Sequence, residues 1–113
     1  FYDQLFAVIR IQRLMTFDRG YAWGRSMDQP GFGLLTPFDG QPATVANGFT
    51  LGFKCNSPEQ LKQFHDTAVA HGGISIEDPP GLREGKMGSM YLAYVRDPDG
   101  HKLCALYRPK PAR

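Results

Sequence analysis

Cys104 is a residue whose type could do chemistry, because a thiol can ligate a metal or act as a nucleophile. It lies in the apolar run Leu103-Cys104-Ala105-Leu106, just after Asp97-Pro98-Asp99-Gly100. Proline presets the backbone of a turn and glycine accepts the positive φ that closes it, so the sequence predicts a hairpin of two strands over residues 91–107. A buried structural thiol is the simpler interpretation of Cys104, and neighbouring cations would make it reactive instead.

A second candidate is the alternating stretch Tyr21-Ala22-Trp23-Gly24-Arg25. Its period of two predicts a strand with the three large side chains on one face. On a concave face they would line a pocket with aromatic surface and one positive charge, which suits a planar or anionic ligand. On a convex face they would form an exposed patch, as at a protein interface. Core packing of Trp23 is the third interpretation.

Other candidates are weaker. Arg83 lies in a Pro- and Gly-rich segment, for which the sequence predicts a mobile loop over residues 79–89 that could cap a pocket. An exposed loop arginine is the plainer interpretation of Arg83. His65 and His71 are six residues apart, so a helix does not bring them to one face as a metal pair. His101 is interpreted as a side chain that flanks the turn.

The elements that must position these residues follow from periodicity and capping. Ser57 as N-cap, Pro58 at the first position and Gln60 completing a capping box predict the start of a helix, which Gly72-Gly73 ends. The sequence predicts a helix over 1–9, strands over 11–17, 21–26, 31–36, 48–55 and 74–77, and then the hairpin.

This order predicts an α+β fold in one domain, residues 1–113, made of two βαβββ modules. The modules would cover residues 1–40 and 46–108. The first would be truncated, since no cap and no strand precede the helix at Phe1, and we expect its first strand to be absent from this sequence.

Composition narrows the class of protein. At 113 residues, with 42% hydrophobic and 21% charged residues, the chain is an ordinary globular domain. A net charge of +2 with scattered basic residues argues against nucleic acid or a membrane surface as the main partner. No apolar run approaches the roughly 20 residues that cross a bilayer. Two cysteines make no disulfide framework, so a cytoplasmic setting is expected.

The closing hairpin, the helix over 64–73 and the loop over 79–83 resemble the vicinal oxygen chelate superfamily, which includes glyoxalases, bleomycin resistance proteins and extradiol dioxygenases. The resemblance implies that each module curls into a half-barrel and that the pair encloses a pocket. It also implies a divalent metal held by His, His or Gln, and Glu. The first of these positions would precede Phe1, and the others fall at Thr50 and Cys104. Because hard cations prefer carboxylate oxygen, these two residues predict no metal site of that type.

We therefore predict a protein of this superfamily that binds a small molecule in its cupped sheet, with a degraded metal site, no cofactor and no assignable catalytic residue. Tyr91 and Tyr94 differ in parity, so one would face the pocket and the other the helices. An active lyase of the glyoxalase I type or an extradiol dioxygenase, with Zn, Fe, Mn or Ni, is the alternative. Exposed sheet edges and the resemblance predict a homodimer. The predicted ligand-binding residues are Tyr21, Trp23, Arg25, Thr50, Arg83, Tyr91 and Cys104.

Overall fold

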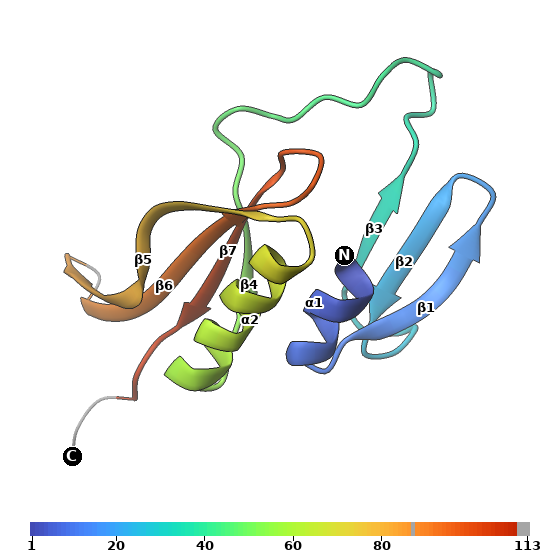
Figure 1. Ribbon diagram of the computed structural model, residues 1–113. Coiled ribbons are helices and arrows are strands. Elements are labelled where there is room, and N and C mark those ends of the chain that lie inside the picture. Colours follow the sequence, from blue (N-terminus) through green and yellow to red (C-terminus); the bar gives the residue numbers. More distant parts are fainter. Residues whose placement is uncertain (87, 111–113) are drawn as a thin grey trace.

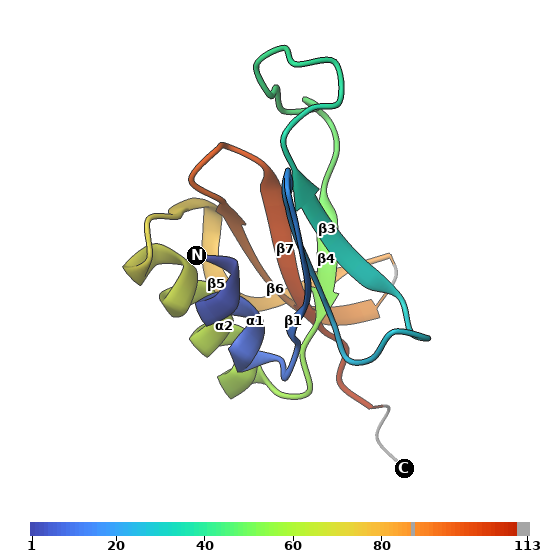
Figure 2. The same ribbon diagram turned by 90° about the vertical axis from the view of Figure 1, so that its right-hand side faces the viewer.

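Two helices and seven strands follow one another in this computed structural model, which describes residues 1–86 and 88–110. Both helices lie on the same side of the strands, and a long connection arches from the first half of the chain to the second (Figure 1, Figure 2). No helix in these residues is long and apolar enough to span a membrane. The elements are α1 (Tyr2–Val8), β1 (Gln12–Phe17), β2 (Gly20–Gly24), β3 (Gly31–Leu35), β4 (Leu51–Lys54), α2 (Pro58–Ala70), β5 (Ile74–Gly85), β6 (Gly88–Arg96) and β7 (Lys102–Tyr107).

The strands form two sheets, and this confirms the predicted α+β class. The first sheet has the order β1-β2-β3 and is antiparallel. The second has the order β4-β7-β6-β5, in which β4 runs parallel to β7 and the other pairs are antiparallel. The sequence of elements from β4 to β7 is a complete βαβββ unit, and α1 to β3 matches its last four elements. The module boundaries at residues 1–40 and 46–108 stay a prediction.

The start of α2 is the one that its sequence predicts. Ser57 Oγ accepts a hydrogen bond from Gln60 N at 3.0 Å, and Gln60 Oε1 accepts one from Asn56 N at 2.6 Å. The first contact satisfies a backbone N–H group that the first turn of a helix leaves without a partner, and the second ties the residue before the N-cap to that turn. At the other end Gly72 has a φ of 103°, which only glycine adopts without strain.

Aromatic rings join the two halves of the core beneath the helices. The Phe6 ring of α1 lies 5.1 Å from Phe32 of β3 and 5.3 Å from Phe53 of β4, measured between centroids. Phe53 in turn lies 5.7 Å from Phe64 of α2. Because Phe6 and Phe64 are fully buried, this chain of rings fixes the two sheets under one helical layer.

A buried carboxylate makes a second link between the halves. Asp97, which is 2% exposed, directly follows β6 and accepts hydrogen bonds at Oδ1 from the backbone N–H groups of Asp99 (3.0 Å) and His101 (2.8 Å). Its Oδ2 accepts the hydroxyl proton of Tyr2 in α1 at 2.6 Å. The turn that the sequence predicted is therefore capped by its own first residue and tied to the opposite half of the chain.

The prediction of a mobile loop over residues 79–89 is wrong for the residues of this segment that the structure describes. β5 continues to Gly85 and pairs with β6 beyond a register shift between Ile76 and Gly81. Pro79 and Pro80 fall inside this shift, where a strand does not need their missing N–H groups. Met87 lies outside the described residues.

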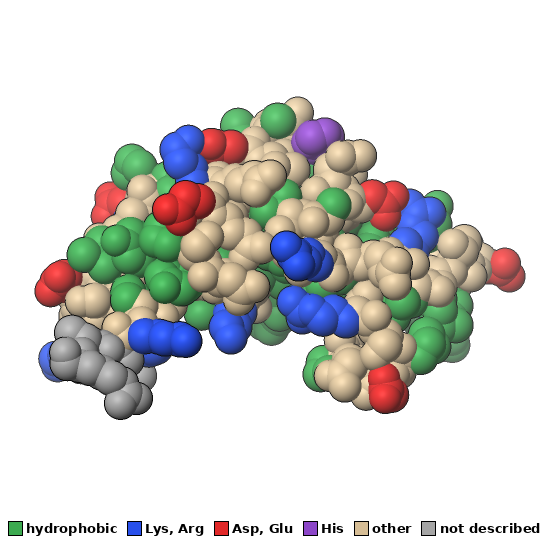
Figure 3. Space-filling view, turned by 90° about the horizontal axis from the view of Figure 1, so that it is seen from below, with side chains coloured by type: hydrophobic (Ala, Val, Ile, Leu, Met, Phe, Trp, Pro, Cys, Tyr) green, Lys and Arg blue, Asp and Glu red, His purple; other side chains and the backbone are tan. Residues whose placement is uncertain are grey.

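Seen from below, the molecule is hollowed between two lobes (Figure 3). The edge strands are β1 and β3 in the first sheet and β4 and β5 in the second.

Candidate functional site

The face of the second sheet that points away from α2 carries the candidate site. Leu103 and Ala105 of β7 belong to the core, so Cys104 between them projects to the opposite face. In the register, Cys104 lies beside Tyr94 of β6 on one side and Gly52 of β4 on the other. The three positions form one row across the middle of the sheet.

Cys104 and Tyr94 are in contact. The thiol is 5% exposed and lies beside Tyr94 in the register, and its Sγ is 3.6 Å from the Ala105 carbonyl oxygen. Burial raises the pKa of the Cys104 thiol, an effect that the neighbouring Tyr94 hydroxyl opposes. Burial also raises the pKa of Tyr94, and the neighbouring thiol adds to that shift. Both groups are therefore neutral at pH 7, and Cys104 is no ready thiolate.

Charged side chains surround this pair. The Lys102 ammonium lies 4.8 Å from the centroid of the Tyr94 ring and forms an ion pair with Glu77. Arg83 donates hydrogen bonds to the carbonyl oxygens of Asp78 (3.1 Å), Pro79 (2.9 Å) and Gly81 (3.1 Å). Its guanidinium thus binds the irregular part of β5, and its positive charge acts to lower the pKa of the Cys104 thiol. The site combines an aromatic ring, a neutral thiol and fixed cations.

The residues at the expected metal positions do not make a ligand set. Thr50 is exposed just before β4, two residues before Gly52, which is the partner of Cys104 in the register. Within the described part of the chain, the His, Cys, Asp and Glu side chains that gather closely enough to hold an ion are Asp97, Asp99 and His101, at the turn after β6. Asp97 there is already occupied as the cap of the turn. A hydroxyl and a protonated thiol do not fit a divalent cation of the kind that the family resemblance implies.

Tyr21, Trp23 and Arg25 are not brought to one cavity. Trp23 is 4% exposed in the core, and its Nε1 donates to Asp3 Oδ1 at 2.8 Å, so core packing is the interpretation that the structure bears out. Tyr21 and Trp23 line a hollow of about 220 Å³ beside α1, whereas Arg25 lines another of about 350 Å³.

The two tyrosines of β6 divide as parity requires. Tyr91 packs against the core, with its ring 6.0 Å from that of Tyr107. Tyr94 is therefore the one that faces the candidate site, and Tyr91, which the sequence offered as a ligand-binding residue, faces the helices.

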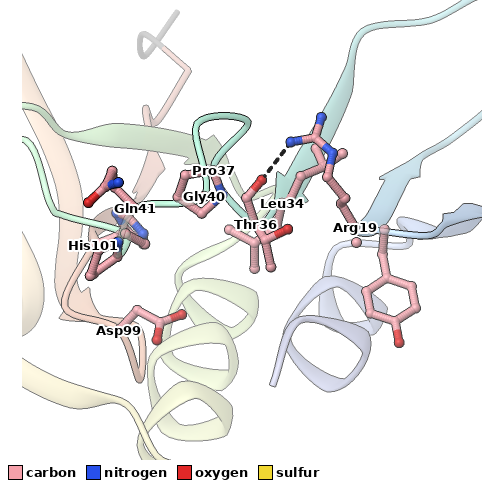
Figure 4. A pocket seen from close by; sticks show the side chains of 13 residues that line it. Arg19, Leu34, Thr36, Pro37, Gly40, Gln41, Asp99 and His101 are labelled. Carbon is pink, nitrogen blue, oxygen red and sulfur yellow. Dashed lines mark hydrogen bonds between the residues drawn. The ribbon is translucent and has the colours of Figure 1, made fainter.

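A larger cavity, about 680 Å³, lies elsewhere, between the β2–β3 strands, the connection that follows them and the turn after β6 (Figure 4). Arg19 and Thr36 lie on one side of it and His101 on the other, and the Arg19 guanidinium donates to the Thr36 carbonyl oxygen at 2.9 Å. The connection over residues 38–50 is exposed throughout, so this cavity is an open space beneath a solvent-exposed connection.

Sequence reasoning missed Lys54 and Lys102 as residues of this face. Their parity was the available signal, because Lys54 is an even number of residues from Thr50 and Lys102 from Cys104. Lysines at strand ends are common on solvated faces, so parity alone gave them no weight.

No protein-family model and no curated protein matches the chain. Among solved structures, it is similar to a glyoxalase/bleomycin resistance protein from Albidiferax ferrireducens T118, with 48% identity and a TM-score of 0.87 over 95% of this chain and 85% of that one. A putative glyoxalase from Bacillus halodurans matches with 16% identity and a TM-score of 0.72, over 96% of this chain and 83% of that one. A glyoxalase/bleomycin resistance protein/dioxygenase family enzyme from Burkholderia phytofirmans PsJN matches with 16% identity and a TM-score of 0.68, over 94% and 84% of the two chains. The last two show the fold alone.

Proposed function

Because this chain belongs to the glyoxalase/bleomycin resistance/dioxygenase superfamily, we propose that it binds a small organic molecule against Tyr94 and Cys104, without a metal. The observation that carries the proposal is the pair of the Tyr94 phenol and the Cys104 thiol, which are partners in the register at the centre of the open face of the second sheet. A ring and a neutral thiol offer apolar surface with polar atoms at its edge, which is the composition of small-molecule sites.

The proposal includes the shape that the resemblance implies. Each sheet would curve as a half-barrel, and the hollow between the lobes in Figure 3 would be the mouth of the shared pocket. A homodimer would cover edge strands that lack a partner in the single chain, among them β1 and β5.

Metal analysis and ligand binding test the proposal together. Protein purified without chelators is analysed for Zn, Fe, Mn and Ni, and its backbone amide resonances are followed during titration with benzamide and catechol. We expect substoichiometric metal and saturable shifts at the amides of Tyr94, Cys104 and Gly52, because these residues share one row. Stoichiometric metal would favour the metal-dependent lyase or dioxygenase instead.

A matched pair of variants sharpens the test. Tyr94→Phe removes the hydroxyl of the phenol in the site and should weaken binding by roughly threefold to tenfold, the effect of one neutral hydrogen bond. Tyr107→Phe removes a hydroxyl from the core side of the same sheet and should leave binding unchanged. If the shifts do not saturate, or if both variants bind like the native protein, the proposed site is wrong.

A further inference from the structure

The open face continues from Gly52 into a hollow where the two modules meet. This hollow of about 350 Å³ is lined by residues between α1 and β1 and by the residue after β2. Residues of β4 and the residue before the N-cap of α2 complete the lining. Its volume is in the range of sites for small ligands. The lining residues are Ile9, Ile11, Arg25, Gly52, Phe53, Lys54 and Asn56.

Two cations enter this hollow from opposite modules. Arg25 follows β2 of the first sheet, and Lys54 ends β4 of the second. No carboxylate is among the residues that line it. In the space-filling view, lysine and arginine side chains gather around the hollow between the lobes (Figure 3).

The charges of these two side chains are not neutralised within the described residues. The Arg25 guanidinium makes one hydrogen bond, from Nη2 to the Ile9 carbonyl oxygen at 3.3 Å, which leaves most of its five donors available. Lys54 is exposed and makes no hydrogen bond or ion pair with any residue that the structure describes. The two positive charges that line this hollow repel each other. An anion bound between them would be attracted by both and would offset that repulsion.

The rest of the lining suits the organic part of a ligand. Ile9, Ile11 and Phe53 supply apolar surface, and Asn56 supplies a side-chain amide. Gly52 connects this hollow with the row of Cys104 and Tyr94, since it lines the first and pairs in register with Cys104. The Leu106 side chain lies beside this glycine, because a Cβ added at Gly52 would be 3.1 Å from Leu106 Cδ2. Lys54 is two residues further along the same strand, roughly 7 Å away, which is the reach of a small aromatic acid.

We propose that the ligand of this protein is a small organic anion whose carboxylate or phosphate binds between Arg25 and Lys54 while its ring lies toward Gly52 and Cys104. This inference rests on the proposed function, because it assigns the charge of the ligand that the same face binds. No covalent step is involved.

Benzoate and benzamide provide the test, because the two probes share shape and differ in charge. Amide titrations of the native protein should show benzoate binding at least about tenfold more tightly than benzamide, which corresponds to one charge-assisted hydrogen bond. The preference should fall to near parity in Lys54→Met and in Arg25→Met, each of which keeps most of the apolar stem. Arg25→Lys should retain part of it. The preference should also weaken as salt is raised.

Lys62→Met is the matched control, because Lys62 is an exposed lysine on α2 whose charge is paired with Asp66. It should bind both probes like the native protein. Equal binding of the two probes at Tyr94 and Cys104 would overturn the anion inference and leave the proposed function intact. A benzoate preference that survives in both methionine variants would also overturn it. If neither probe gives saturable shifts, the inference and the proposed function fail together.

Discussion

Replacing Tyr2 by phenylalanine should cost this protein a large part of its stability through a single oxygen atom. The Tyr2 hydroxyl donates to Asp97 Oδ2 at 2.6 Å, and the two residues are only 5% and 2% exposed. In Tyr2→Phe the ring keeps its packing beside Phe6 and Trp23, while a buried carboxylate oxygen loses its donor. A hydrogen bond to a charged group contributes about 1.5–3 kcal/mol, so we expect a loss of about 2 kcal/mol in the free energy of unfolding.

Urea unfolding followed by the fluorescence of Trp23 measures this loss, because Trp23 is the one tryptophan of the chain and its ring lies 5.6 Å from that of Tyr2. The midpoint should fall by about 1 M urea and the melting temperature by roughly 8 °C. Tyr107→Phe is the control, since its hydroxyl has no hydrogen-bond partner among the described residues. A double-mutant cycle of Tyr2→Phe with Asp97→Ala should give a coupling of about 1–3 kcal/mol. A Tyr2→Phe protein within about 0.5 kcal/mol of the native protein, a difference usual for neutral surface changes, would refute the reasoning.

Three further outcomes are expected. Burial and the Asp97 charge raise the pKa of Tyr2 above its ordinary range. The contribution of the Tyr2 hydroxyl to stability is therefore complete below about pH 10 and is lost as the unfolded chain deprotonates above that pH. In urea titrations, the difference in stability between native and Tyr2→Phe protein should shrink from about pH 9 to 11. Burial raises the pKa of the Cys55 thiol to about 11 and raises that of Cys104, so a thiol reagent at pH 8 should label neither cysteine in folded protein and both in denaturant; prompt labelling of folded protein would contradict the burial. Arg83→Met should leave three carbonyl groups without their donor and speed amide hydrogen exchange over residues 76–84, without a comparable change in β7. Unchanged exchange over residues 76–84 would show that the hydrogen bonds of Arg83 do not stabilise the irregular strand.

Local chemistry was enough to predict those parts of the fold whose cause lies within a few residues. The capping of α2 by Ser57 and Gln60 and the turn at Asp97 each depend on contacts within four residues. The far half of β5 could not be predicted in this way. Pro79 and Pro80 are strong local signals for a loop, but the strand exists because β6 pairs with it across the register shift, a contact that the segment does not encode alone.

The same distinction explains the candidate site. Parity predicted that Tyr21 and Trp23 share a face, and it could not say which face. Contacts with α1 determine the face, because the Trp23 ring packs against Tyr2 and Phe6 and its indole N–H donates to Asp3. Trp23 therefore packs in the core.

Charge is the property of the site that local sequence hides most completely. Lys54 and Arg25 are 29 positions apart in the numbering and lie on different modules. Each looks like an ordinary solvated side chain at the end of a strand, and only the packing of the two sheets under one helical layer brings both to the same hollow. Their meeting has an energetic consequence that separate surface lysines lack, because removing either cation from an empty hollow would relieve repulsion. Lys54→Met should therefore leave the stability of the unliganded protein unchanged or slightly raised while it removes the benzoate preference. A structural lysine would show the opposite pattern, with stability falling and binding following it.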